Sequence, residues 1–120
     1  TIAGDNARRA ALEAAGCTVI SVAPDAAGHP DAAAMAAAFG SRGLTRVLIE
    51  GGGRLAASFL ATGLVDEVAW FRAPLIMGGD GRDAAAAMGI NAIAEAPRFI
   101  RSRVVEVGGD LMELYERRSD

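Results

Sequence analysis

The run Val47-Leu48-Ile49-Glu50-Gly51-Gly52-Gly53-Arg54-Leu55 decides how this sequence is expected to fold. Its first residues are apolar on both faces of an extended chain, which is typical of a central parallel strand. The glycines mark a tight turn, and Leu55 with Phe59 four residues later predicts one apolar face of a helix over residues 53–62. The run therefore predicts a strand, a loop and a helix of an α/β fold, in which ligands bind beyond the carboxyl ends of strands.

The segments on either side continue this alternation of helix and strand patterns. Short β-branched or apolar runs predict strands, and alanine-rich runs that end at glycine predict helices. Gly108-Gly109 between two alternating runs is typical of a β-hairpin. We expect helices at 5–15, 30–39, 53–62 and 80–88, strands at 17–22, 46–50 and 67–73, and a hairpin of 98–107 with 110–117. The predicted class is a single α/β domain over residues 1–120, with three layers and a mixed, mostly parallel sheet that ends in an antiparallel hairpin.

Composition excludes several classes of function. The net charge of −3 argues against a nucleic-acid partner, which requires a basic face. All twelve basic residues are arginine, so no lysine can act as a Schiff base or a general base. One cysteine and one histidine predict no metal site and no disulfide within the chain. The apolar runs are too short to span a membrane, and we expect a cytoplasmic protein.

The glycine turn is the strongest candidate for a ligand site. Glycines let a ligand approach the backbone, and the N–H groups at a helix start favour a phosphate. Arg54 adds a fixed positive charge. From residue types alone, an anion site and a plain tight turn are equally favoured. Glu50 likewise has two open roles, which are to accept hydrogen bonds from a ligand or to cap the N–H groups of Gly52 or Gly53.

Several pieces taken together carry a family resemblance. The run 48–60, Leu64-Val65-Asp66-Glu67, Ala73-Pro74-Leu75-Ile76-Met77-Gly78-Gly79 and Gly108-Gly109-Asp110-Leu111-Met112-Glu113-Leu114-Tyr115 occur in this order. In order and spacing they resemble the C-terminal reductase domain of the bifunctional riboflavin-biosynthesis deaminase/reductase (RibD type). The resemblance covers essentially the whole chain, and it is weaker before residue 46.

This resemblance implies a dihydrofolate-reductase-like fold and an NADPH cofactor. It also implies reduction of 5-amino-6-(5-phosphoribosylamino)uracil, a pyrimidine nucleotide, to the ribitylamino product by a homodimer. Glu50 is then expected to contact the pyrimidine substrate, a cis peptide is expected between Gly51 and Gly52, and Arg54 is a candidate for the 2′-phosphate. The cofactor is expected to contact Gly51, Gly52, Gly53, Arg54, Leu55, Ala56, Ala57 and Ser58.

One departure from the family limits the expected activity. The family's reductase domain opens with a strand and a Ser-Leu-Asp-Gly-like loop, and no such motif occurs here. We therefore expect the chain to be the C-terminal part of that domain, with the catalytic residues upstream and the isolated chain inactive. Two alternatives remain, namely a dihydrofolate-reductase-like enzyme for another substrate, and a truncated domain that acts in dimer assembly.

Other residues are expected to have structural roles. Cys17 is expected in the core, and one of Trp70 and Phe71 is expected to enter it. Arg98, Arg101 and Arg103 are expected on a solvated strand face.

Overall fold

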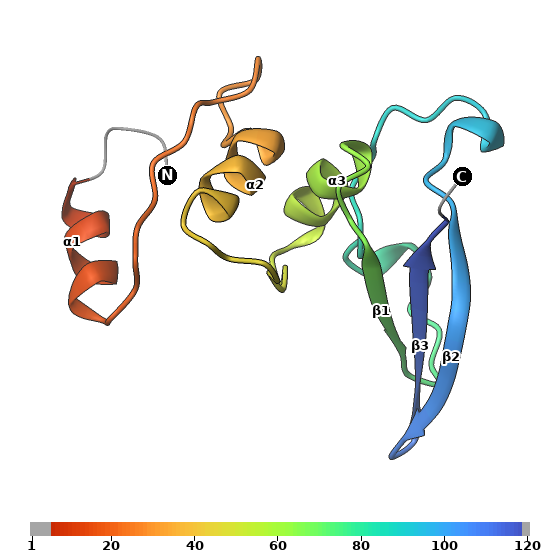
Figure 1. Cartoon of the computed structure of the whole chain (residues 1–120). Helices are drawn as coiled ribbons and strands as arrows, with labels where there is room; N and C mark the ends of the chain where they lie inside the picture. The colour runs from red at the N-terminus through yellow and green to blue at the C-terminus, as the bar shows by residue number, and fades with distance from the viewer. Residues whose placement is uncertain (1–5, 119–120) are drawn as a thin grey trace. The chain divides into compact units, whose positions relative to one another are not determined.

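The computed structural model describes residues 6–118 and divides into two compact units, residues 1–49 and 50–120. Figure 1 shows the elements in chain order. The bounds are α1 Asn6–Ala14, α2 Ala32–Gly40, α3 Gly53–Ala61, β1 Glu67–Arg72, β2 Phe99–Val107 and β3 Asp110–Arg117, with short 3₁₀ helices at Gly78–Asp80 and Ile93–Glu95. No helix in this part of the chain is long and apolar enough to cross a membrane.

The first unit contains two of the expected helices. The helix expected at 5–15 is α1, although residue 5 itself lies outside the described residues. It ends as glycine predicts, because Gly16 has φ +85° and the N–H of Cys17 donates to the Leu12 carbonyl at 3.0 Å. The helix expected at 30–39 is α2, and Asp31 caps it by accepting a hydrogen bond from Ala34 N at 2.7 Å.

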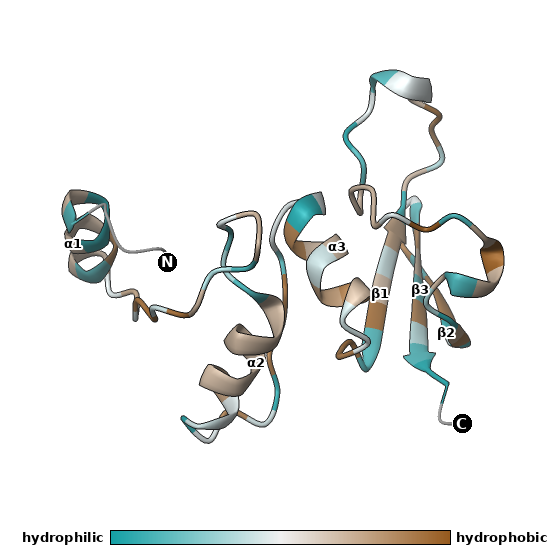
Figure 2. Cartoon of the chain, turned by 90° about the horizontal axis from the view of Figure 1, so that it is seen from above, coloured by the Kyte–Doolittle hydropathy of each residue, from teal (hydrophilic) through white to brown (hydrophobic). Residues whose placement is uncertain are grey.

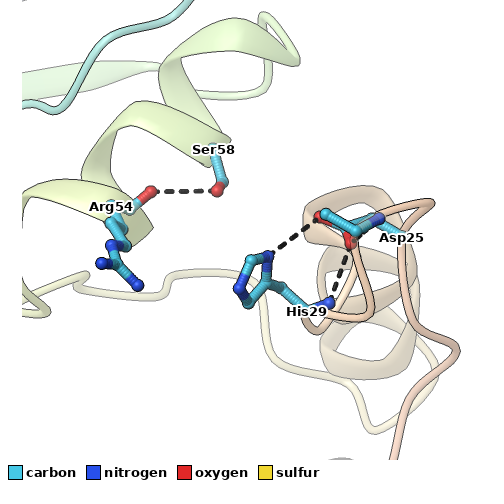
Figure 3. A network of polar contacts seen from close by, with 5 residues as sticks. Asp25, His29, Arg54 and Ser58 are labelled. Atoms are coloured by element: carbon cyan, nitrogen blue, oxygen red, sulfur yellow. Dashed lines mark hydrogen bonds and ion pairs between the residues drawn. The ribbon is translucent and has the colours of Figure 1, made fainter.

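The loop before α2 is organised by one aspartate. The Asp25 carboxylate accepts hydrogen bonds from the backbone N–H groups of Ala27 at 2.9 Å and His29 at 2.8 Å. Figure 3 shows Asp25 facing His29, whose ring Nδ1 lies 3.9 Å from the second carboxylate oxygen. Pro24 and Pro30 form an isolated antiparallel bridge across the loop. These contacts give His29 a local structural role.

The two strands expected at 17–22 and 46–50 are not formed. In the described part of the chain, neither segment has a neighbouring strand to complete its backbone hydrogen bonds, and a parallel strand requires one. Their apolar residues are left accessible, with Leu48 at 79% exposure, and Cys17 is exposed rather than in the core. The described residues contain no parallel strand pairing, so the expectation of a mostly parallel sheet is not confirmed.

The sheet lies in the second unit and is antiparallel, in the order β1-β3-β2. The hairpin expected at 98–107 and 110–117 is confirmed, and Gly108 takes φ +65° at its turn. Strand β1 confirms the strand expected at 67–73. Arg117 at the end of β3 forms an ion pair of 2.8 Å with Asp66, the residue just before β1. The described sheet is thus a hairpin of β2 and β3 with β1 added at the free edge of β3.

Strands β1 and β2 both run antiparallel to β3, so they are parallel to each other. The segment 73–98 must therefore return from the end of β1 to the start of β2, and Figure 1 shows it running back along the sheet. The helix expected at 80–88 within this segment is wrong, because residues 84–88 form no helix. Ala86 N instead donates to the Gly53 carbonyl at 2.9 Å, so the segment is fixed by α3 and not by its own helical bonds.

Helix α3 supplies the buried residues of this unit together with the sheet. Ala57 and Phe59 are each 6% exposed, and Leu60 contributes to a pocket with β1. Figure 2 shows apolar colour on α3 and on the strands. Trp70 and Phe71 alternate between the two faces of the sheet, and both remain accessible, at 40% and 63%. Neither enters a core, which corrects the expectation for this pair.

Candidate functional site

The start of α3 presents backbone donors that the described residues do not use. Gly52 is the N-cap, with φ −67° and ψ 172°, and it has no side chain to cap the helix. Its carbonyl accepts from Leu55 N at 2.9 Å and Ala56 N at 3.2 Å. The N–H groups of Gly53 and Arg54 have no acceptor among the described residues. The positive end of the helix dipole therefore lies beside two unpaired donors, which is an arrangement suited to an anion.

The three glycines differ in what their missing side chains allow. A Cβ on Gly53 would lie 2.5 Å from the Asp83 carbonyl oxygen, and a Cβ on Gly51 would collide with the Leu55 side chain. At Gly53 backbone atoms fill the space, whereas at Gly51 the Leu55 side chain fills it. A Cβ on Gly52 would meet nothing within 4 Å. Only Gly52 therefore leaves room that an external ligand can use.

Glu50 does not cap the glycine turn. Its carboxylate is exposed and has no hydrogen-bond or ion-pair partner in the part of the chain that the structure describes. Of the two roles left open by the sequence, the capping role is therefore wrong. The carboxylate remains available to accept hydrogen bonds from a ligand beside α3.

The residues of α3 divide by accessibility. Figure 3 shows Arg54 and Ser58 one helical turn apart, with the Ser58 hydroxyl donating to the Arg54 carbonyl at 2.9 Å. Both are exposed, and the Arg54 guanidinium has no ion-pair partner among the described residues. In contrast, Ala57 is buried and Leu55 and Ala56 are half-buried. The accessible part of the expected cofactor site is thus formed by Gly51, Gly52, Arg54 and Ser58.

The peptide bond between Gly51 and Gly52 is trans, as are all the others that the structure describes. The expected cis bond is therefore wrong for this structure. The trans form is favoured by about 3 kcal/mol for a bond that does not precede proline.

A second candidate site was not found from the sequence. An open pocket of about 740 Å³ lies over one face of the sheet, with walls from α3, the three strands and residues 88–97. Trp70, Phe99 and Tyr115 supply aromatic surface, and Glu113 lies among them at 4% exposure. The sequence did contain a signal for this site. Leu111, Glu113 and Tyr115 share one face of β3, and a carboxylate stands there where a residue facing the core is usually apolar.

Two arginines hold Glu113. Arg72 Nε lies 2.9 Å from one carboxylate oxygen, and Arg101 Nη1 lies 3.1 Å from the other. Desolvation raises the pKa of Glu113, but the hydrogen bond from Arg101, the charge of Arg72 and the hydrogen bond from Tyr115 together lower that pKa below its ordinary value. The carboxylate is therefore ionised at neutral pH. Arg101 accordingly does not lie on a plain solvated face, which corrects the expectation for that residue.

A β-bulge separates the arginines of β2. The pairing shifts between Arg101, opposite Tyr115, and Arg103, opposite Leu114. Because Tyr115 and Leu114 point to opposite faces of β3, the two arginines do so as well. The extra residue is Ser102, whose hydroxyl donates to the Leu114 carbonyl at 3.3 Å. This irregularity places Arg101 over the pocket and Arg103 on the other face.

Comparisons with known proteins agree with the resemblance seen in the sequence. Residues 5–112 match the family model described as the RibD C-terminal domain. The riboflavin biosynthesis protein RibD of Escherichia coli (strain K12) is 32% identical over 88 residues, which are 73% of this chain and 24% of that protein. A 2,5-diamino-6-ribosylamino-4(3H)-pyrimidinone 5′-phosphate reductase of Methanothermobacter thermautotrophicus is 42% identical over 74 residues, which are 61% of this chain and 34% of that protein.

The fold has a solved counterpart. The structure of Acinetobacter baumannii RibD superposes with a TM-score of 0.72 at 23% identity, over 92% of this chain and 29% of that one. The chain thus spans about a quarter to a third of the length of the relatives it matches. Because the family model matches most of the chain, this chain belongs to the RibD C-terminal domain family.

Proposed function

We propose that this chain forms part of an NADPH-dependent reductase that reduces 5-amino-6-(5-phosphoribosylamino)uracil to its ribitylamino product in riboflavin biosynthesis. The observation that carries the proposal is the start of α3, where unpaired N–H groups, an open Gly52 and the unpartnered Arg54 lie together. Membership of the RibD C-terminal domain family supports it, as does the name of the Methanothermobacter relative.

In this proposal the chain binds and orients two reactants. The N–H groups of Gly53 and Arg54 donate hydrogen bonds to a phosphate of NADPH, and the Arg54 guanidinium adds a charged contact to the cofactor. The buried Ala57 and the half-buried Leu55 fix α3 against the rest of the unit, so the donors are held in place before binding. When bound, NADPH supplies the hydride. Glu50 accepts hydrogen bonds from the pyrimidine ring of the substrate.

Several finer expectations belong to the same proposal. The chain forms a single domain over residues 1–120 with three layers and a mostly parallel sheet, in which residues 17–22 and 46–50 pair with other strands. The protein is a cytoplasmic homodimer. One observation favours an additional role in assembly. The sheet face opposite the pocket exposes Phe71 of β1 by 63% and Ile100 of β2 by 56%, which is a large amount of apolar surface on the two outer strands.

Calorimetric titration of the chain with NADPH and with NADH tests the cofactor assignment. We expect NADPH to bind, and Arg54→Gln to weaken it about tenfold because one charge-assisted hydrogen bond is lost. Arg103→Gln is the matched control, since it removes the same charge from the sheet and is expected to leave the affinity unchanged. If neither nucleotide binds, or if both variants bind NADPH as the parent does, the assignment to α3 fails.

The substrate and assembly roles are separated by two further measurements. Oxidation of NADPH is followed by absorbance with the pyrimidine nucleotide and, separately, with dihydrofolate. Turnover of dihydrofolate alone would replace the proposed substrate. Light scattering gives the mass, and a dimer that neither binds NADPH nor turns over either substrate would favour a purely assembling domain.

A further inference from the structure

The pocket on the sheet has the dimensions and lining of a ligand site. Its volume of about 740 Å³ lies within the roughly 300–1,000 Å³ that is usual for small-molecule sites. Most of the lining is apolar, with Met88 and Pro97 on the wall formed by the crossover segment and Leu60 on the wall formed by α3. The charged side chains are few and converge on one point. This pattern of apolar walls with a small polar centre is the one that orients a bound molecule.

The polar centre carries a positive surplus. Two guanidinium groups, of Arg72 and Arg101, face the single carboxylate of Glu113. Only one arginine is needed to balance Glu113, so neutralisation of a buried acid does not account for both. The arginine side chains are 55% and 59% exposed, while that of Glu113 is 6% exposed. The surplus charge therefore lies on groups that a molecule in the pocket can reach.

The hydrogen-bonding capacity of the centre also favours an anion. One oxygen of Glu113 accepts a hydrogen bond from Arg101 Nη1 at 3.1 Å, and the other forms an ion pair with Arg72 Nε at 2.9 Å. A cation in the pocket would find these acceptors occupied and the two arginines repelling it. Each arginine uses one nitrogen in these contacts, so further N–H donors of each fork remain for a second acceptor. Carboxylate and phosphate groups match such forks.

Aromatic side chains lie directly beside the charged centre. Trp70 is paired with Glu113 across β1 and β3, and Arg101 is paired with Tyr115 across β2 and β3. Directly paired residues point to the same face within about 5 Å. Phe99 lines the pocket two positions before Arg101. A flat ring can stack on this surface while its acidic substituent reaches the arginines.

We propose that this pocket binds a planar aromatic anion, meaning a flat ring that carries a carboxylate or a phosphate. Arg72 and Arg101 bind the acidic group, Glu113 fixes the orientation of both guanidinium groups, and Trp70 with Tyr115 packs against the ring. The site is separate from the start of α3, and it stands or falls independently of the reductase assignment.

A pair of probes with the same ring tests the charge requirement. Titration with 2-naphthoate and with neutral 2-naphthamide is followed by calorimetry and by the NMR signal of the indole N–H. Trp70 is the chain's only tryptophan, so this signal reports on the pocket alone. We expect the indole signal to shift when naphthoate binds. We also expect naphthoate to bind at least about tenfold more tightly than naphthamide. 2-Naphthyl phosphate distinguishes a phosphate preference from a carboxylate preference.

Variants of β2 locate the contact. Arg101→Gln is expected to abolish the difference between the two probes, whereas Arg103→Gln, on the other face of the same strand, is expected to retain it. If Arg101→Gln disturbs the dispersed amide signals of β2 and β3, Arg101→Lys keeps the charge without the fork and is expected to lower naphthoate affinity several-fold. Equal affinities for the two probes, an unmoved indole signal or equal losses in both glutamine variants would each overturn the proposal. So would a pocket closed by a second copy, seen as a doubled mass with no naphthoate binding.

Discussion

Gly53→Ala tests whether the glycine turn is shaped by the protein or by a ligand. The added Cβ would lie 2.5 Å from the Asp83 carbonyl oxygen and 3.3 Å from Ala86 N, and both are backbone atoms that cannot rotate away. The closer contact is about 0.9 Å shorter than the 3.4 Å at which ordinary contact begins. The substitution also strains the hydrogen bond of 2.9 Å from Ala86 N to the Gly53 carbonyl.

The expected loss follows from two opposing effects. Overpacking of this kind costs about 1–3 kcal/mol, and replacing glycine by alanine in a helix returns up to about 1 kcal/mol. We expect the free energy of unfolding to fall by about 1–2 kcal/mol and the melting temperature to fall by roughly 4–8 °C for each kcal/mol lost. Urea denaturation followed by circular dichroism measures the first quantity, and calorimetry measures the second.

Gly52→Ala is the matched control for this experiment. Its Cβ would meet nothing within 4 Å, and its φ of −67° suits alanine. Alanine is a poorer N-cap than glycine, which lowers stability, but it also loses less conformational entropy on folding, which raises stability. We therefore expect the free energy of unfolding to change by less than about 0.5 kcal/mol. A Gly53→Ala protein as stable as the Gly52→Ala protein would refute the packing of residues 83–86 against α3.

Two further predictions concern a helix cap and a buried carboxylate. Asp31→Ala removes the acceptor at 2.7 Å from Ala34 N and is expected to destabilise α2 by about 1 kcal/mol, seen as lost helical circular dichroism at a lower urea concentration, whereas Asp31→Asn should retain most of the stability. The pKa of Glu113 is lower in the folded chain than its ordinary value of 4.5, so its ionised form stabilises the fold above that pH, and the stabilisation is lost as pH falls through the folded pKa. Glu113→Gln is expected to be less stable than the parent near neutral pH and to approach the parent's stability as the pH falls below 4.5 and through the folded pKa. A difference in unfolding free energy that is independent of pH would contradict this.

Local patterns predicted the elements that complete their own hydrogen bonds. The helices α1, α2 and α3 carry their bonds within the segment, and Gly16 ends α1 as its residue type predicts. The cap at Asp31 was not expected, because Pro30 was predicted to lie in the first turn of α2. The hairpin of β2 and β3 has its partner one turn away at Gly108-Gly109. Residues 46–50 failed for the opposite reason, because a parallel strand depends on segments far away in the sequence.

The candidate site shows the same division. Unpaired donors at the start of α3 were predictable because they follow from helix geometry. The contact of Gly53 with Asp83 was not, since the alanine-rich run 84–87 favours a helix by propensity alone and the tertiary contact overrides it. Nor was the Glu113 centre, because its arginines come from two other strands and one of them depends on a bulge. Sequence spacing does not reveal partners that only the register brings together.

The bulge at Ser102 also bears on how this strand can change in evolution. Removing that one codon would leave Arg101 opposite Tyr115 and Arg103 opposite Leu114, so every remaining pair across the hairpin would be kept. Relatives one residue shorter at this point can therefore carry the same arrangement of side chains. An alignment that assumes strict alternation along β2 would instead assign the residues after Ser102 to the wrong face of the sheet. It would then place Arg101 and Arg103 on the same face, although they lie on opposite faces in this protein.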